Sequence, residues 1–313
     1  MRIHSTHKAR AAFFTQALAA CALLLMSCAT APHAGAEFPQ RDALRFFDPG
    51  ALEYLRLSGP ALKRFSPIIV PALNSKSAES ALARASSASI AIYDSIQSSS
   101  VQNEQTAVLP RFEAIINGDF PAFWTRLSLR FSKGIKAQNG CFTDSASGIE
   151  IAVPVSGTVA AGSAEIGSLL ERLAKDRENT VAGPVPERHV PLEDSGLFLY
   201  VPNAAKRLVP FLDEDASGLP LSALLAAARP LGGDSYSLSI VLLTADENTA
   251  RIFRPIARLL WLGFSRSFFP DGAQELALPD FRQSGSDIIA SDIPLKGSEI
   301  EAILRHFSSG NTN

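Results

Sequence analysis

Two patterns of apolar positions run along the chain, one typical of helices and one typical of strands. In residues 166–173 and again in residues 300–307, apolar side chains recur at positions i, i+3, i+4 and i+7. This spacing predicts two amphipathic helices that each bury one face. Residues 149–153 place apolar side chains at every second position instead, which predicts a strand with one buried side. The chain therefore mixes helices and strands.

The predicted elements occur twice in the same order. The stretch "GSAEIGSLLERL" from Gly162 matches "GSEIEAILRHF" from Gly297 with one residue deleted. Upstream, residues 51–65 and 196–209 each predict a short strand, a turn and a helix. We interpret the repeat as an internal duplication. It predicts an α+β fold of two related ferredoxin-like units, each an antiparallel sheet with helices on one face.

The duplication also sets the expected boundaries. The first unit spans residues 44–175 and the second spans residues 195–308, and a short tail follows at 309–313. Residues 176–194 between the units are polar and contain prolines, which is typical of a linker. In the last helix, Ser298 and Glu301 have the spacing of a capping box, so this helix is expected to begin at Ser298.

The first residues have the layout of a secretory signal. Residues 1–10 are basic without an acidic residue, and residues 11–26 are apolar except for Thr15 and Gln16. The apolar run is shorter than the roughly 20 residues that a membrane-spanning helix needs. We therefore exclude this segment from the folded protein.

The end of the signal resembles the lipobox of bacterial lipoproteins. Residues 25–28 read Leu-Met-Ser-Cys, with an apolar residue three positions before the cysteine and a small residue directly before it. The resemblance implies that residues 1–27 are removed, that the Cys28 thiol carries diacylglycerol, and that a fatty acid such as palmitate acylates its new amino terminus. Several acyl chains anchor a protein stably without a spanning helix. Residues 28–43, rich in small residues and proline, would then form a tether.

An alternative processing route and the choice of membrane follow from neighbouring residues. Ordinary secretion with cleavage after Ala36 is the alternative, because residues 34–36 form an A-x-A-like site. In lipoproteins of the enteric type, an aspartate after the lipidated cysteine favours retention in the inner membrane. Alanine occupies that position here, as Ala29. The resemblance therefore favours the outer membrane.

Composition and cysteine usage restrict the classes of function. The chain is 46% hydrophobic and 19% charged, with a formal net charge of −2. This composition is globular, and the charge argues against a nucleic-acid partner, which needs many basic residues. Removal of Cys21 with the signal and lipidation of Cys28 leave Cys141 alone, so no disulfide is expected within the chain. We expect Cys141 to be a small buried residue, with a reactive thiol as the alternative.

Residues that carry cofactor, metal or nucleophile chemistry are sparse. The mature chain has histidines at His33, His189 and His306, and their spacing suggests neither a metal site nor a catalytic triad. Residues 213–218 resemble the first half of an EF-hand loop, but the position of its bidentate glutamate is Leu224. A solvated acidic loop is the preferred interpretation. We therefore predict no cofactor, no metal and no enzymatic activity.

Two predicted helices combine aromatic and basic residues and are the candidate binding elements. The preferred interpretation is that their rings pack on a sheet while the arginines extend into solvent. The alternative is that they meet anionic lipid headgroups or another polyanion of the envelope. Pro255 is expected to kink the second of these helices or to mark its start. The candidate binding residues are Trp124, Arg126, Arg130, Arg251, Arg254, Arg258 and Trp261.

Together these patterns predict a lipid-anchored protein of the bacterial envelope with a non-enzymatic binding or scaffolding role. Its partners would be the membrane, through Cys28, and an envelope protein or lipid. One alternative is a carrier or sensor of a small apolar or anionic ligand, held in a cleft between the two units. A second alternative is an envelope hydrolase that uses Glu113, Asp119 and Glu150 on or near neighbouring strands.

Overall fold

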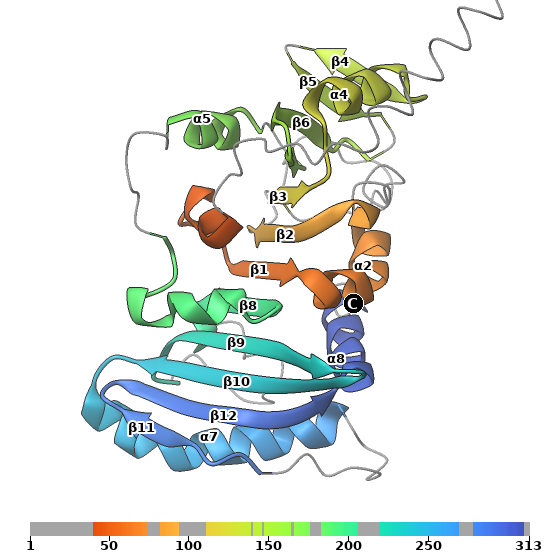
Figure 1. Cartoon of the computed structure of the whole chain (residues 1–313). Helices are drawn as coiled ribbons and strands as arrows, with labels where there is room; N and C mark the ends of the chain where they lie inside the picture. The colour runs from red at the N-terminus through yellow and green to blue at the C-terminus, as the bar shows by residue number, and fades with distance from the viewer. Residues whose placement is uncertain are drawn as a thin grey trace, which may run out of the picture. The chain divides into compact units, whose positions relative to one another are not determined.

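The strands of the described residues form one antiparallel sheet of twelve strands, in the order β11-β12-β10-β9-β8-β1-β2-β3-β7-β6-β5-β4 (Figure 1). The computed structural model describes residues 40–73, 82–93, 111–138, 140–145, 147–163, 166–175, 183–205, 219–268 and 278–309. The strands are β1 Glu53–Ser58, β2 Ala85–Ile92, β3 Phe112–Gly118, β4 Ile135–Gln138, β5 Cys141–Asp144, β6 Glu150–Val155, β7 Thr158–Gly162, β8 Leu197–Pro202, β9 Leu221–Gly232, β10 Ser235–Thr244, β11 Arg282–Ser284 and β12 Asp287–Lys296. The strand predicted over residues 149–153 is confirmed as β6.

Helices cover both faces of the sheet. The helical elements are η1 Gln40–Phe46, α2 Gly59–Leu73, α4 Ala122–Phe131, α5 Gly167–Lys175, η2 Glu187–Asp194, α7 Glu247–Phe268 and α8 Gly297–Ser309, where η marks a 3-10 helix. Helices α2, α4, α7 and α8 pack on one face, which we name the α2 face. Elements η1, α5 and η2 pack on the opposite face, which we name the η2 face. Each face has its own hydrophobic core.

The pattern of side chains along the central strands explains the two cores. On β1, Leu57 points to the α2 face and Tyr54 points to the η2 face. Phe65 of α2 is fully buried, and its ring centre lies 5.8 Å from that of Tyr236. On the other face, Tyr54 stacks on Tyr200 of β8 at 5.8 Å. Full burial of one such side chain contributes about 1.5–3 kcal/mol, so these rings are major contributors to both cores.

The prediction of two duplicated ferredoxin-like units is wrong. Strands β1 and β8 pair with each other, with Tyr54 opposite Tyr200, and this pairing joins both halves of the chain into one sheet. Helices α5 and α8, which the repeat made equivalent, lie on opposite faces, since Leu169 and Ile300 belong to separate cores. The physical reason is that a local apolar pattern identifies the buried side of an element but not the element that covers it.

Two helices are present as predicted, but the second begins with a different cap from the expected one. Amphipathic helices are confirmed as α5, with Leu169 and Leu173 buried, and as α8, with Ile300 buried. The cap lies on other residues than the expected Ser298 and Glu301, because α8 begins at Gly297 and the carboxylate of Glu299 accepts from the backbone N–H of Lys296 at 2.6 Å. The carboxylate of Glu301 instead accepts a hydrogen bond from Arg64 Nε at 2.9 Å. The predicted linker 176–194 ends in η2, which is packed on the sheet. Residues 1–39, with the signal and Cys28, lie outside the described residues.

Candidate functional site

Helix α4 presents a stripe of aromatic side chains to solvent. It follows Pro121 and ends at Phe131, and the backbone N–H of the next residue, Ser132, donates to the carbonyl of Leu129. None of its residues is buried, and Phe123 and Phe131 are 67% and 79% exposed. Trp124 is partly exposed and meets Phe123 edge to face, with ring centres 5.1 Å apart. Exposed rings that adjoin on one helix mark an interaction surface, because soluble proteins rarely leave large apolar patches uncovered.

The two arginines of α4 differ in their contacts: Arg126 binds the backbone of β6, and Arg130 lies in the exposed last turn of the helix. Arg126 is turned toward β6, where its Nε donates to the carbonyl of Val153 at 3.0 Å and its Nη2 also reaches the carbonyl of Pro154 at 3.3 Å. It therefore fixes α4 on the sheet. Arg130 is exposed in the last turn, and Lys133 and Lys136 are exposed just beyond it.

Helix α7 buries the ring that the sequence proposed for binding. Ala250, Phe253, Ala257 and Trp261 recur at helical spacing and are all buried against the sheet. The Trp261 ring stacks on Phe264, with centres 5.7 Å apart. Trp261 is thus a core residue, whereas the rings of α4 are exposed. The preferred interpretation of rings packed on the sheet holds for α7 and fails for α4.

The three arginines of α7 are exposed, as expected. Arg251 Nη2 donates to the side chain of Asn248 at 2.6 Å, and Arg258 Nη2 lies 3.4 Å from the carboxylate of Asp280. Asp280 also accepts from Arg282 Nε at 2.9 Å. One carboxylate thus serves two guanidinium groups, and Arg254 is exposed on the same helix.

A second stripe on α7 was missed at the level of the sequence. Ile252 and Leu259 are 61% and 67% exposed, and Ile256 between them is also exposed. Pro255 lies inside α7 without ending it. The signal in the sequence was a second set of aliphatic residues at i, i+4 and i+7, offset from the buried set. Only the packing of Phe253 and Trp261 distinguishes the two sets.

Two of the three carboxylates considered for hydrolysis, those of Glu113 and Glu150, accept hydrogen bonds that stabilise the fold. The third, that of Asp119, lies away from Glu113. Glu113 is buried and accepts hydrogen bonds from Tyr93 Oη at 2.8 Å and from Arg172 Nη2 at 2.7 Å. Burial, and then the negative charge of Glu113, raise the pKa of Tyr93 far above its usual range. Glu150 accepts from the backbone N–H of Ile166 at 3.1 Å and so supports the start of α5. Asp119 is exposed at the opposite end of β3 from Glu113.

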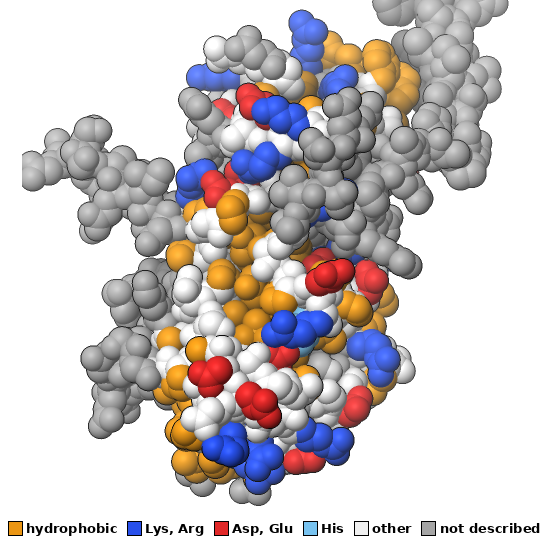
Figure 2. All heavy atoms as spheres, turned by 90° about the vertical axis from the view of Figure 1, so that its left-hand side faces the viewer, with side chains coloured by type: hydrophobic (Ala, Val, Ile, Leu, Met, Phe, Trp, Pro, Cys, Tyr) orange, Lys and Arg blue, Asp and Glu red, His pale blue; other side chains and the backbone are white. Residues whose placement is uncertain are grey.

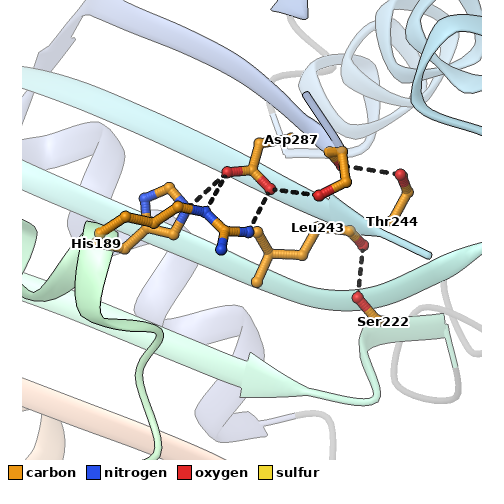
Figure 3. A network of polar contacts seen from close by, with 7 residues as sticks. His189, Ser222, Leu243, Thr244 and Asp287 are labelled. Atoms are coloured by element: carbon orange, nitrogen blue, oxygen red, sulfur yellow. Dashed lines mark hydrogen bonds and ion pairs between the residues drawn. The ribbon is translucent and has the colours of Figure 1, made fainter. Parts of the chain in front are cut away.

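A polar network around the buried carboxylate of Asp287 holds η2 on the sheet, and the sequence analysis did not predict it (Figure 3). The carboxylate of Asp287 accepts from Arg188 Nε at 2.7 Å and from Arg188 Nη2 at 2.8 Å. His189 Nε2 lies 2.9 Å from the same carboxylate. Burial alone would raise the pKa of Asp287, but the hydrogen bonds from Arg188 and His189 outweigh it and lower this pKa. The network fixes η2 across the strands.

The residues considered for metal and thiol chemistry lie only partly within the described chain. Within the part of the chain that the structure describes, no three histidine, cysteine or acidic side chains gather as metal ligands would. The EF-hand-like segment 213–218 lies outside the described residues, and Leu224 is part of β9. Cys141 is partly buried, and burial together with Glu150 raises the pKa of its thiol, which disfavours the reactive thiolate.

Partly buried aliphatic side chains form a row across the middle of the α2 face. The backbone pairing places the row on five adjacent strands, from β2 through β1, β8 and β9 to β10. Each member is only partly buried although it packs on the core of this face. The row is Ile90, Leu55, Leu199, Ala226 and Ile240. It crosses the junction of the two halves, where the sequence predicted a ligand cleft.

One side of the molecule carries both basic and acidic side chains. Figure 2 shows that, among the described side chains, basic and acidic groups alternate there around a band of hydrophobic ones. Mixed charge gives no extended field of one sign. Among the described helices, none is both long and apolar enough to cross a bilayer.

Comparisons with known proteins support the fold. No protein-family model and no curated protein matches the sequence. Crystal form III of TP0453 matches with a TM-score of 0.56 and 17% identity, over 85% of this chain and 97% of that one. Crystal form I gives 0.55 and 17% over 86% and 97%, and crystal form IV gives 0.53 and 15% over 84% and 96%. The likeness spans both halves, so it also contradicts two separate ferredoxin-like units.

Proposed function

We propose that this protein is a lipid-anchored, non-enzymatic protein of the bacterial envelope that binds a membrane surface through α4. The observation that carries the proposal is the exposed aromatic stripe of α4, formed by Phe123, Trp124 and Phe131. Aromatic rings favour the interface between headgroups and acyl chains, where their apolar bodies are buried. Cys28 and the stripe would act together, since two weak membrane contacts hold a protein more firmly than one.

The basic residues beside the stripe favour anionic headgroups. Arg130 is exposed in the last turn of α4, and Lys133 and Lys136 are exposed shortly after it in the chain. Each basic residue near an anionic lipid surface contributes about 1 kcal/mol at moderate ionic strength. The start of η1 at Gln40 lies twelve positions after Cys28, and a fully extended chain of that length spans at most about 40 Å. The anchor would therefore keep the folded part close to the membrane.

Lipidation is tested directly with the full chain produced in a bacterium fed a labelled fatty acid. We expect label on the wild-type protein, none on Cys28→Ser, and a mature amino terminus at Cys28 by mass spectrometry. A mature terminus at Glu37, without label, would instead support ordinary secretion. Ala29→Asp tests the proposed outer-membrane location, because it should shift the lipidated protein toward the inner membrane if the enteric sorting pattern applies.

Membrane contact by α4 is tested by flotation with vesicles that contain an anionic phospholipid, using the chain from Ala29 onward so that no anchor contributes. Phe123→Ser and Phe131→Ser should each lower the partition into vesicles about tenfold, given about 1.5–3 kcal/mol for burying a phenylalanine. Leu231→Ser, at an exposed site near the end of β9, is the matched control and should leave partition unchanged. Equal partition of all variants would refute the role of α4.

A carrier of a small apolar ligand is the second candidate function. The row of aliphatic side chains on the α2 face favours it, because it offers apolar surface where the two halves meet. Native mass spectrometry of the protein should then detect a bound apolar molecule of defined mass. Leu199→Lys, which places a charge in the row, should abolish that species. If the wild-type protein carries no ligand, this candidate function loses its support.

A further inference from the structure

Helix α7 has three distinct sides. One side is buried against β10, β11 and β12 and contains Phe253 and Trp261. A second side exposes Ile252, Ile256 and Leu259, and the remaining side carries the exposed arginines. A helix that has already buried one apolar side in its own core has no need of a second one for folding. The second apolar side is therefore available for a contact outside the described part of the chain.

We propose that the exposed side of α7 binds an amphipathic helix with acidic flanks from another envelope protein. The exposed aliphatic residues recur at i, i+4 and i+7, which is the spacing of a seam between two packed helices. Arg251 and Arg258 directly precede Ile252 and Leu259. Their long side chains can therefore reach acidic residues on a helix that lies along the stripe. This inference goes beyond the membrane contact proposed for α4.

The charge around the stripe favours an acidic partner over a second copy of this chain. A second copy would pair antiparallel about Ile256, and this would bring the arginine-bearing sides of both helices together. Asp280 does not neutralise them, because it is shared between Arg258 and Arg282. Like charges at such an interface disfavour association, whereas carboxylates on a partner would be attracted.

The side-chain chemistry also distinguishes α7 from α4. Interfacial membrane helices use aromatic rings, and α4 exposes Phe123 and Phe131. Among the described side chains of α7, Phe253 and Trp261 are buried, and the exposed stripe is aliphatic. Branched aliphatic residues are the ones that pack into the seams of paired helices. The two helices are thus suited to different partners, a lipid surface for α4 and a helix for α7.

The test uses the full lipidated chain in detergent and two designed peptide helices of about three heptads, with leucine along the seam. One peptide carries glutamate beside the seam and its twin carries lysine at the same positions. Fluorescence anisotropy should show that the acidic peptide binds at least about tenfold more tightly than the basic twin. Leu259→Asp should weaken its binding at least about tenfold, because a charge replaces a buried leucine at the seam. Arg258→Glu should weaken it about fivefold or more.

Control variants and competing outcomes make the result decisive. Leu231→Asp, exposed near the end of β9, should bind the acidic peptide as the wild type does. Equal affinity for both peptides, or binding that survives Leu259→Asp, would overturn the proposal. Sedimentation of the wild type as a dimer that Leu259→Asp dissociates would overturn it in favour of a second copy. A loss of vesicle partition in Leu259→Asp without any peptide binding would overturn it in favour of a membrane.

Discussion

Replacing Asp287 by alanine is expected to lower the free energy of unfolding by about 2–3 kcal/mol. Asp287 is buried at the start of β12, and its carboxylate is the common acceptor for Arg188 and His189 of η2. The substitution therefore removes every contact that this carboxylate makes with η2. Because the alanine leaves a buried histidine without its partner, the cost includes an unsatisfied polar group as well as lost hydrogen bonds.

The magnitude follows from the exposure of each partner. The Arg188 side chain is 56% exposed, so water replaces much of what it loses, and its bidentate contact is discounted to about 1 kcal/mol. His189 is buried, so its hydrogen bond at 2.9 Å contributes about 1–2 kcal/mol. Because His189 and Asp287 share this hydrogen bond, the losses of stability caused by Asp287→Ala and His189→Ala should not be additive. A double-mutant cycle should give a coupling of about 1 kcal/mol.

Urea denaturation followed by circular dichroism measures these values. The matched control is Asp280→Ala, whose exposed carboxylate meets Arg258 and Arg282 at the surface and should leave the midpoint unchanged. If Asp287→Ala is as stable as wild type, or if it shows no coupling to His189→Ala, then the network does not hold η2 on the sheet. The structural explanation of this segment would then be refuted.

The same network predicts a pH dependence with a definite sign. The pKa of Asp287 is lowered in the folded state, so its contribution is fully present above the unfolded pKa of about 3.9. That contribution is lost as the pH falls through the lowered folded pKa. The stability difference between wild type and Asp287→Asn should therefore shrink at acid pH. A difference that stays constant down to the acid limit would exclude this linkage.

Two further predictions concern single residues on β3. Gly118→Ala should destabilise the fold by about 1–3 kcal/mol in urea denaturation, because a Cβ there would clash with the carbonyl oxygen of Arg84. The control is Gly167→Ala, which has open space around it and should unfold at a midpoint close to that of wild type. Glu113→Gln should let Tyr93 ionise at lower pH in an ultraviolet titration, because the nearby negative charge is removed. An unchanged tyrosine titration would show that burial alone sets this pKa.

Local patterns in the sequence predicted individual elements well. The apolar spacing of residues 166–173 and 300–307 identified α5 and α8, and the alternation of residues 149–153 identified β6. These predictions succeeded because the period of a buried side is a property of the element itself. The capping box was assigned to the wrong residues. Glu299 accepts from the backbone N–H of Lys296, and the carboxylate of Glu301 binds Arg64, which is far away in the sequence.

The candidate site was predicted in part. The sequence identified both helices and their arginines, but it treated their rings alike, whereas Trp261 is buried and Phe123 is exposed. It also missed the stripe of Ile252 and Leu259, because aliphatic residues on a helix near a sheet are usually core residues. Distinguishing a core side from a second apolar side requires the packing partners.

By itself, the sequence determined the positions of many helices and strands, the lipobox-like segment around Cys28 and the scarcity of catalytic residues. The tertiary structure alone decided that β1 pairs with β8, and thereby that both halves form one sheet. It also decided which rings face solvent and that η2 is held by Asp287. The physical reason is that backbone periodicity is local, whereas strand neighbours, burial and ion pairs depend on residues far apart in the chain.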